Sequence, residues 1–294
     1  MSKVGFIGLG VMGRPMAGHL QAGGHELLVV KHRKPLPEEL IEGGAVVCAT
    51  PKEVTEKSEL VITMLPDTPD VATVLFGARG VTEGLGSGKT VVDMSSISPI
   101  ETKTFAERIN GLGSDYLDAP VSGGEVGAKA ATLTIMVGGP EAAFERVKPL
   151  LELMGRNITL VGGNGDGQTC KVANQIIVAL TIEAVAEALL FASKAGADVA
   201  KVRQALMGGF AGSRILEVHG ERMVKRTFEP GFRIELHQKD LGLALMGARV
   251  LNISLPNTAS AQELFNACAA RGWGGLDHAA MVRALEILSG HQLG

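Results

Sequence analysis

The chain contains 294 residues, of which 46% are hydrophobic, and its formal net charge is only −3 at pH 7. This composition is typical of a globular protein with a substantial core and excludes a disordered chain. The charge balance lacks the basic excess of a nucleic-acid-binding protein and the Lys/Arg block of a membrane-surface protein. We therefore expect neither nucleic acid nor a membrane as a partner.

Three cysteines, Cys48, Cys170 and Cys268, lie far apart in the chain. Their odd number and irregular spacing argue against a disulfide framework or a metal site, and a reducing compartment fits best. The N-terminal sequence KVGFIGLG lacks the parts of a signal peptide. The most apolar stretch, Ile176 to Ala195, is interrupted by three charged residues and indicates a buried helix rather than a membrane span. We expect a cytoplasmic protein.

The first half of the chain alternates short β-rich runs with helical stretches. This alternation is typical of an α/β domain with a doubly wound, mostly parallel sheet covered by helices on both faces. The candidate strands are Val4–Ile7, Glu26–Val30, Val46–Cys48, Leu60–Met64, Thr90–Met94, Asp115–Leu117, Leu133–Val137 and Ile158–Leu160.

The pattern changes after the glycine-rich turn GGNGDG, and only helical periodicity follows it. We therefore predict a first domain over residues 1–163 and an all-α domain over residues 164–294, which begins with a long helix. The candidate helices are Gln168–Ala195, Ala197–Met207, Gly212–Val224, His237–Val250, Thr258–Arg271 and His278–Leu288.

The segment GLGVMG follows a strand-like run and precedes a helical one, which is the context that a G-x-G-x-x-G dinucleotide-binding fingerprint requires. Its first glycine permits a tight turn, its second lets the backbone approach a pyrophosphate, and its third allows close helix–strand packing. An ordinary glycine turn is the alternative. The predicted cofactor loop comprises Gly8, Leu9, Gly10, Val11, Met12 and Gly13.

The second predicted strand ends in VVKHRKP, where this fingerprint normally places an acidic residue against the ribose 2′-hydroxyl of NAD. His32 falls there, followed by Arg33 and Lys34. A carboxylate would repel a 2′-phosphate, whereas an arginine can bind it with two parallel hydrogen bonds. The sequence therefore favours NADP(H) over NAD(H), with solvated surface charges as the alternative.

Three further motifs contain polar residues: DAPVSGGE, GDGQTCKVANQ and PGFRIELHQKDL. In the second, Lys171, Asn174 and Gln175 are spaced i, i+3, i+4 and share one face of an otherwise apolar helix. Polar groups on such a face need partners, and a ligand pocket supplies them. A solvated lysine is the plainer alternative.

With GFIGLGVMG, DAPVSGG, GxGxxxKxxNQ and KDL in this order, the chain resembles the β-hydroxyacid dehydrogenase family over essentially its whole length. The segments GGFAGSRIL and PGFRIELHQKDL look most like its tartronate semialdehyde reductase branch. The resemblance implies a Rossmann domain followed by an all-α domain, an active site between them, and a homodimer or homotetramer. It also implies NAD(P)H-dependent reduction of tartronate semialdehyde to D-glycerate.

Carried over by residue, the resemblance implies that Lys171 is the catalytic lysine and that Asn174 supports it and positions the substrate. The substrate-binding residues would be Ser122, Gly123, Gly124 and Gln175. Further cofactor-binding residues would be Met64, Leu65, Pro66, Ser96, Phe232 and Lys239.

A lysine can act as a general acid in such a reduction, if partial burial lowers its pKa toward neutrality. We find no set of zinc ligands and expect no metal. Oxidation of 3-hydroxyisobutyrate or 4-hydroxybutyrate, reduction of succinic semialdehyde, and cofactor binding without turnover remain alternatives. Arg214 and Arg233 are additional candidates for carboxylate binding or surface ion pairing, whereas His219, His237 and His278 are interpreted as structural.

Overall fold

The computed structural model describes residues 2–31 and 35–294. The predicted 2′-phosphate site at His32, Arg33 and Lys34 therefore lies outside the described residues. The chain forms two compact units, Met1–Lys171 and Val172–Gly294. The division falls inside the long helix α8, whereas the sequence pattern places a boundary near residue 163.

The first unit is built on one sheet. Over the described residues it has nine strands in the order β3-β2-β1-β4-β5-β6-β8-β7, with β9 paired to β8. The strands β1 to β6 are parallel, whereas β8 runs antiparallel to β6 and β7. They are β1 Lys3–Ile7, β2 Glu26–Val30, β3 Val46–Cys48, β4 Leu60–Thr63, β5 Thr90–Asp93, β6 Asp115–Asp118, β7 Val121–Ser122, β8 Leu133–Gly138 and β9 Gly155–Gly162.

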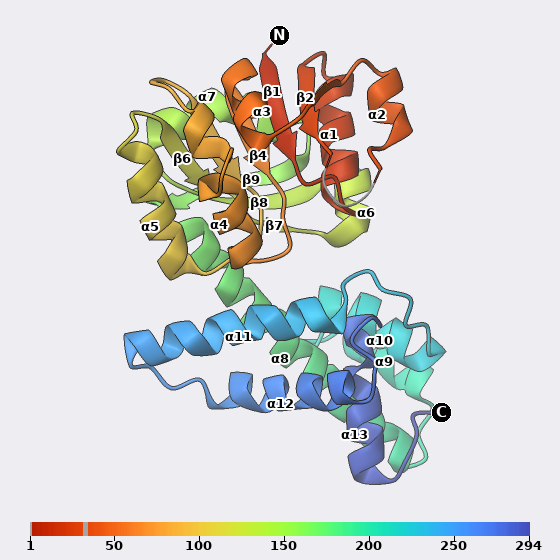
Figure 1. Cartoon of the computed structure of the whole chain (residues 1–294). Helices are drawn as coiled ribbons and strands as arrows, with labels where there is room; N and C mark the ends of the chain where they lie inside the picture. Colours follow the sequence, from red (N-terminus) through yellow and green to blue (C-terminus); the bar gives the residue numbers. More distant parts are fainter. Residues whose placement is uncertain (1, 32–34) are drawn as a thin grey trace. The chain divides into compact units, whose positions relative to one another are not determined.

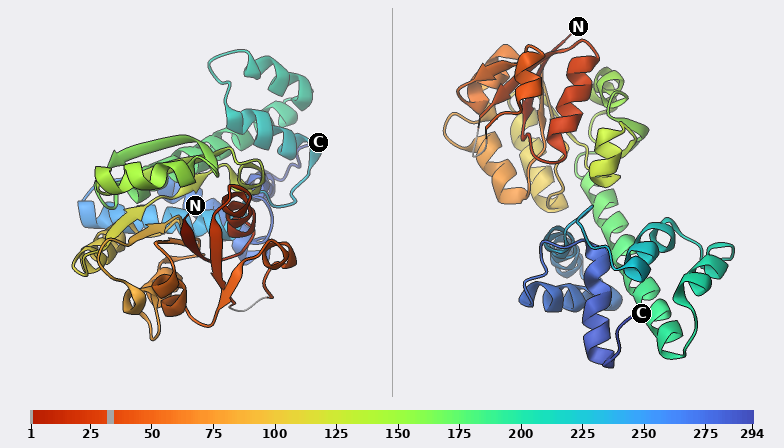
Figure 2. Two further views of the ribbon diagram at one scale, coloured as in Figure 1. Left: turned by 90° about the horizontal axis from the view of Figure 1, so that it is seen from above. Right: turned by 90° about the vertical axis from the view of Figure 1, so that its right-hand side faces the viewer.

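Helices cover both faces of this sheet, as Figure 1 and the two turned views in Figure 2 show. One buried cluster packs α1, α6 and α7 against one face, and a second packs α3, α4 and α5 against the other. The helical segments are α1 Gly13–Ala22, α2 Glu38–Glu42, α3 Pro51–Lys57, α4 Thr68–Phe76, the 3-10 turn η1 Val81–Gly84, α5 Pro99–Asn110, α6 Gly124–Lys129 and α7 Glu141–Leu151.

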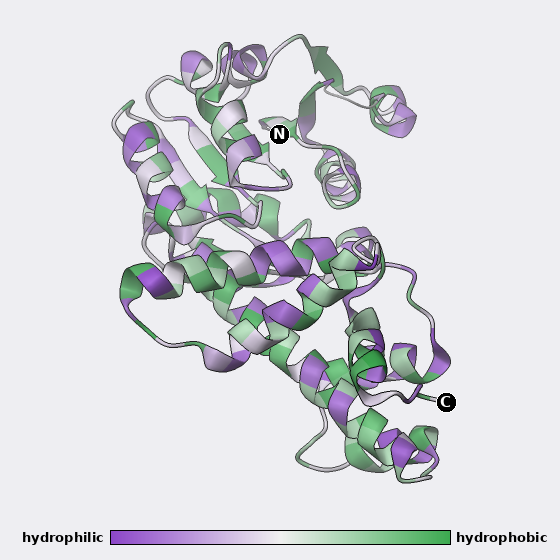
Figure 3. Cartoon of the chain, turned by 60° about the horizontal axis from the view of Figure 1, so that its bottom comes forward, coloured by the Kyte–Doolittle hydropathy of each residue, from purple (hydrophilic) through white to green (hydrophobic). Residues whose placement is uncertain are grey.

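The strands supply both clusters because successive side chains point to opposite faces. In β2, Leu27 and Val29 join the first cluster and Leu28 joins the second. Figure 3 shows the result as largely hydrophobic strands beside helices that carry both hydrophobic and hydrophilic residues. The predicted doubly wound, mostly parallel sheet is confirmed.

Three helices on one face of the sheet begin with the same type of N-terminal cap. The side chains of Thr50, Asp67 and Ser98 cap α3, α4 and α5, and each helix has a proline in its first turn. Such caps satisfy backbone N–H groups that have no partner inside the helix. These loops follow the carboxyl ends of β3, β4 and β5, so the caps fix the edge of the sheet that carries most of the predicted site.

The second unit is helical, as predicted. Its core is formed mainly by α8, α10, α11, α12 and the C-terminal segments, with the fully buried Phe265 at its centre. The helices are α8 Asp166–Lys194, which begins in the first unit, α9 Val199–Met207, α10 Arg214–Lys225, α11 Ile234–Leu251, α12 Pro256–Ala270, the 3-10 turn η2 His278–Met281 and α13 Val282–Ser289.

Helix α8 is long and apolar enough to cross a membrane by length and composition, and 33% of its most apolar window is buried. Core helices of globular proteins have the same properties. Ala179, Ile182 and Leu189 are buried in the helical core, whereas Ile177 and Phe191 are exposed. The burial expected from the sequence therefore applies to one side of α8.

Candidate active site

The glycine loop between β1 and α1 has the geometry that its sequence predicts. Gly8 has φ +109°, and a Cβ there would clash with the carbonyl oxygen of Met64. A Cβ on Gly13 would clash with the carbonyl oxygen of Gly8, so this glycine allows α1 to begin tightly against the loop. Around Gly10 there is no heavy atom within 4 Å of a Cβ position. The backbone is thus open to a pyrophosphate, and the residues present fit a dinucleotide.

The segment Met64–Pro66 is hydrogen-bonded to the loops on either side of it, which follow β1 and β5. The Met64 N–H donates to the carbonyl oxygen of Ile7 at 2.9 Å, next to the glycine loop. The Leu65 N–H donates to the Ser95 hydroxyl oxygen at 2.9 Å. Ser96, which is half-buried, follows directly. The structure therefore brings the glycine loop, the segment Met64–Pro66 and Ser96 together along the carboxyl edge of the sheet.

A buried carboxylate, Asp93, organises the end of β5. It accepts hydrogen bonds from the Thr63 hydroxyl at 2.8 Å, the Ser95 N–H at 3.1 Å and the Tyr116 hydroxyl at 3.3 Å. Burial raises the pKa of Asp93, although these hydrogen bonds oppose the shift. The same burial, with the nearby carboxylates, raises the pKa of Tyr116. The network fixes the Ser95–Ser96 turn.

A second buried carboxylate, Asp118 at the end of β6, holds the start of α8. It accepts hydrogen bonds from the Gly165 N–H at 2.7 Å and the Gln168 N–H at 2.9 Å. These are N–H groups that a helix start leaves without helical partners. Burial raises the pKa of Asp118 to about 6, while the two backbone hydrogen bonds act in the opposite direction.

The Gln168 side chain completes this anchor. Its Nε2 donates to the carbonyl oxygen of Ser95 at 2.7 Å, and its Oε1 accepts from the Ile97 N–H at 3.1 Å. The turn that contains Ser96 is thus bonded on both sides to the first turn of α8. Lys171 follows three residues later on the helix and is only 6% exposed. Sequence reasoning missed Asp118 and Gln168, although both stand in the motifs DAPVSGGE and GDGQTCKVANQ.

The predicted carboxylate-binding loop follows Asp118. Ser122 ends β7 and pairs with Thr134 of β8. Gly123 and Gly124 have φ of +132° and +59°, backbone conformations that favour glycine. The strand β7, which was not predicted, pairs antiparallel with β8 at the edge of the sheet and so holds this loop beside the start of β8.

In the helical unit, Asp240 joins three of the predicted site residues. Gln175 Nε2 donates to Asp240 Oδ2 at 2.6 Å, and Asn174 Nδ2 donates to Gln175 Oε1 at 2.8 Å. Lys239 Nζ lies 3.1 Å from Asp240 Oδ1. Asp240 is 2% exposed, and in the sequence only its position beside Lys239 marks it.

The remaining predicted residues lie in other surroundings. The Phe232 N–H donates to Asp277 at 3.2 Å, and the ring packs against His237 and His278. Arg214 and Arg233 pair with Glu217 and Glu235 at the surface, which supports the ion-pair alternative for both arginines. The three histidines interpreted as structural are hydrogen-bonded to one another.

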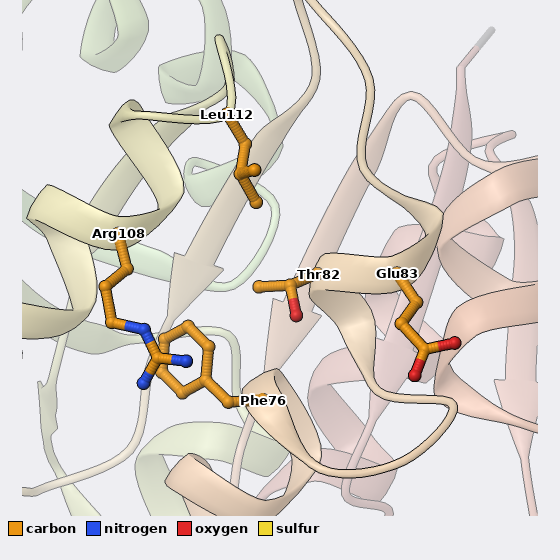
Figure 4. A pocket seen from close by; sticks show the side chains of 5 residues that line it. All are labelled: Phe76, Thr82, Glu83, Arg108 and Leu112. Carbon is orange, nitrogen blue, oxygen red and sulfur yellow. The ribbon is translucent and has the colours of Figure 1, made fainter.

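A hollow of about 380 Å³ lies elsewhere in the first unit and is shown in Figure 4. It contains an Arg108 guanidinium 3.5 Å from the centre of the Phe76 ring. Its walls come from the ends of α4 and α5, where helices return toward the amino edge of a parallel sheet. Ligands of such folds bind at the opposite, carboxyl edge, so this hollow is not the candidate site. Its lining residues are Phe76, Thr82, Glu83, Arg108 and Leu112.

The fold and the glycine loop define an NAD(P)-dependent oxidoreductase, and comparison with known proteins agrees. Residues 3–163 match the family model described as the NAD-binding domain of 6-phosphogluconate dehydrogenase. Residues 165–285 match the model described as NAD-binding of NADP-dependent 3-hydroxyisobutyrate dehydrogenase. The chain belongs to the β-hydroxyacid dehydrogenase family.

Individual relatives are similar over nearly the whole chain. The 2-hydroxy-3-oxopropionate reductase of Escherichia coli (strain K12) is 67% identical over 291 residues, which are 99% of each chain. The solved structure of 3-hydroxyisobutyrate dehydrogenase from Mycobacterium tuberculosis with L-serine has a TM-score of 0.87 and 31% identity, covering 97% of this chain and 99% of that one. A structure of Psf3 with NADP+ and 2-OPP has a TM-score of 0.84 and 25% identity, covering 96% and 99%.

The raised pKa of Asp118 makes a prediction about stability. Because the folded-state pKa of about 6 lies above the ordinary aspartate value of 3.8, the neutral form stabilises the fold at low pH. This contribution should be lost as pH rises from about 4 to about 6, by roughly 3 kcal/mol at about 1.4 kcal/mol per pKa unit. Asp118→Asn should flatten that part of the pH profile of the unfolding free energy, measured by urea titration. An unchanged profile in the variant would contradict the assignment.

Proposed function

We propose that this protein reduces tartronate semialdehyde (2-hydroxy-3-oxopropanoate) to D-glycerate with NADPH. The observation that carries the proposal is the buried Lys171 on a helix whose first turn is bonded to Asp118 and, through the Gln168 side chain, to the Ser96 turn. A lysine held so firmly beside a dinucleotide-binding edge suits acid–base chemistry better than surface solvation. The identity to the Escherichia coli 2-hydroxy-3-oxopropionate reductase supports the choice of substrate.

The bound cofactor would supply a hydride to the aldehyde carbon. Lys171 would stabilise the negative charge that develops on the carbonyl oxygen and would deliver the proton from its Nζ atom. In the reverse direction the neutral amine would accept that proton. Asn174 would orient the substrate and support the lysine.

The substrate's carboxylate would bind at the Ser122–Gly124 loop. The Ser122 hydroxyl and the backbone N–H groups of Gly123 and Gly124 are hydrogen-bond donors with little side-chain bulk. A loop of this kind favours a short acid of three or four carbons. Gln175 would add a substrate contact in this arrangement.

The cofactor would lie along the residues gathered at the carboxyl edge of the sheet. Gly10 offers its backbone to the pyrophosphate, while Ser96 and the segment Met64–Pro66 would line the nicotinamide side. Phe232 and Lys239 are further proposed cofactor contacts, from the resemblance to the family. Preference for NADP(H) rests on His32, Arg33 and Lys34 in the sequence and on a related structure that contains NADP+.

The other partner would be a second copy of this chain, in a homodimer or homotetramer. Large apolar side chains stand exposed on the helical unit, and contiguous apolar surface commonly marks an interface. Light scattering should give two or four times the chain mass of 30.6 kDa. A cytoplasmic location fits the near-neutral charge and the free cysteines. The exposed apolar residues include Ile177, Phe191, Phe210, Met246, Val250, Leu251 and Leu288.

A substrate panel tests the proposed activity. With NADPH, kcat/KM for tartronate semialdehyde should exceed that for succinic semialdehyde. With NADP+, kcat/KM for the oxidation of D-glycerate should exceed that of 3-hydroxyisobutyrate and 4-hydroxybutyrate. Preference for a hydroxybutyrate would move the assignment to another branch of the family. Cofactor binding without turnover on any of these compounds would instead favour a non-catalytic protein.

The Lys171→Ala variant tests whether Lys171 is the general acid. Removal of a positioned proton donor should lower kcat by about 10²- to 10⁴-fold. The dissociation constant of NADPH, measured by fluorescence titration, should stay within about threefold of the wild-type value, a change of less than 1.4 kcal/mol. Lys201→Ala on α9, whose side chain is 81% exposed, is the matched control and should keep wild-type turnover. A comparable loss of NADPH binding in Lys171→Ala would refute the assigned role.

Arg33→Ala tests the cofactor preference. If Arg33 binds the 2′-phosphate, the ratio of kcat/KM with NADPH to that with NADH should fall at least about tenfold, the effect of about 1.4 kcal/mol. Lys31→Ala, in the same segment, should change the ratio less because a single ammonium lacks the paired donors of a guanidinium. Equal ratios in Arg33→Ala and wild type would make the segment a solvated loop.

A further inference from the structure

Three histidines in the helical unit form a continuous chain of ring contacts. His237 Nδ1 lies 2.9 Å from His278 Nδ1, and His278 Nε2 lies 3.1 Å from His219 Nε2. At one end, His237 Nε2 lies 3.0 Å from the backbone carbonyl oxygen of Gln175. At the other end, His219 Nδ1 lies 3.4 Å from Asp277 Oδ1. The chain thus joins α10, η2 and α11 to the helix that carries the proposed catalytic lysine.

The Gln175 end fixes the direction of the hydrogen bonds. A carbonyl oxygen only accepts, so His237 Nε2 must carry a proton. A neutral His237 then accepts at Nδ1 from His278 Nδ1. A neutral His278 likewise accepts at Nε2 from His219 Nε2.

The Asp277 end is a contact between a ring nitrogen and a carboxylate. His219 Nδ1 lies 3.4 Å from Asp277 Oδ1, and this buried nitrogen has no hydrogen-bond partner among the described residues. The N–H groups at His219 Nε2, His278 Nδ1 and His237 Nε2 supply one ring proton to each of the three hydrogen bonds of the chain.

The surroundings fit this direction. Asp277 is negatively charged: burial raises its pKa, but the neighbouring His219 and the hydrogen bonds from backbone N–H groups outweigh burial and hold the pKa below its usual range. His278 is neutral, because burial and the facing His237, His219 and Arg222 hold its pKa well below the usual range. A neutral His278 can donate at one ring nitrogen and accept at the other, as the chain requires.

Asp277, His219 and His278 also have the composition of a metal-ligand set. However, Asp277 accepts hydrogen bonds from the backbone N–H groups of Gly231, Phe232 and Ala279, and Arg222 lies 3.1 Å from its Oδ2. A cation there would displace these bonds and face a guanidinium. The cluster is therefore better suited to hydrogen bonding than to metal binding.

We propose that His219, His278 and His237 form a directional hydrogen-bond chain, which starts beside Asp277 and positions Gln175 for the reaction. His237 holds the Gln175 backbone, while Asp240, one helical turn later on α11, holds its side chain and pairs with Lys239. The chain is not a route for protons to substrate, because the Gln175 carbonyl passes none on. Its catalytic consequence rests on the proposed function, whereas its protonation pattern does not.

Nuclear magnetic resonance of ¹⁵N-histidine-labelled protein tests the protonation pattern directly, without substrate. At neutral pH, His278 should be protonated on Nδ1 alone and His237 on Nε2 alone, with assignments from single-histidine variants. The opposite tautomers in His278 and His237 would overturn the proposal whether or not the enzyme uses tartronate semialdehyde.

Two substitutions test the positioning role. His219→Leu removes the donor to His278 and should lower kcat/KM by about tenfold, equivalent to about 1.4 kcal/mol. His219→Gln keeps an amide donor near the Nε2 position without an ionisable group. It should restore most of that loss, because a donor to His278 is kept.

His291→Leu is the matched control, because His291 contacts Ser193 in the same unit and lies outside the chain of histidines. It should keep wild-type kinetics. Wild-type kcat/KM in His219→Leu, or equal losses in the leucine and glutamine variants, would show that His219 does not position the site through its donor.

Discussion

The candidate site depends on the hydrogen bonds between the Asp118 carboxylate and the first turn of α8. Asp118 ends a central strand, and α8 carries Lys171, so this one contact connects the rigid sheet to the proposed acid. Gln168 strengthens it by bonding the Ser95 carbonyl and the Ile97 N–H. A side chain that stabilises a developing charge is most effective when the fold already holds it in position. The protein then reorganises little as the transition state forms.

The same helix is held again three to four residues beyond Lys171. There Gln175 is bonded through its side chain to Asp240 and through its backbone carbonyl to His237. Both ends of this polar stretch are thus fixed by buried charged or imidazole groups within their own units. Such groups are costly to bury unless each has a partner, and nearly every polar atom in these networks has one.

Periodicity in the sequence was sufficient to predict the fold. Alternating apolar runs located eight of the strands, and the helices after residue 165 lie close to their predicted bounds. The short strand β7 was missed because two residues are too few to show a pattern of alternating hydrophobicity. Its antiparallel pairing with β8 is a long-range contact that the local sequence does not reveal. The predicted domain boundary is marked by glycines, whereas the compact units divide within a continuous helix, which no local pattern reveals.

Parts of the candidate site have a local signature in the sequence. The glycine loop has one, and Lys171, Asn174 and Gln175 share a helix face. Asp118, Gln168 and Asp240 were not identified as partners, because their contacts join residues 47 to 73 positions apart. The chain of histidines was equally hidden: each histidine alone is an ordinary structural residue, and only the fold shows that they form one network.

The most direct test of the proposed activity follows the hydride. Reduction of tartronate semialdehyde with NADPH carrying deuterium in the transferred position at C4 should yield glycerate with one deuterium at C3, detected by mass spectrometry and magnetic resonance. Glycerate without deuterium, or oxidation of the cofactor without glycerate, would contradict direct hydride transfer to this substrate.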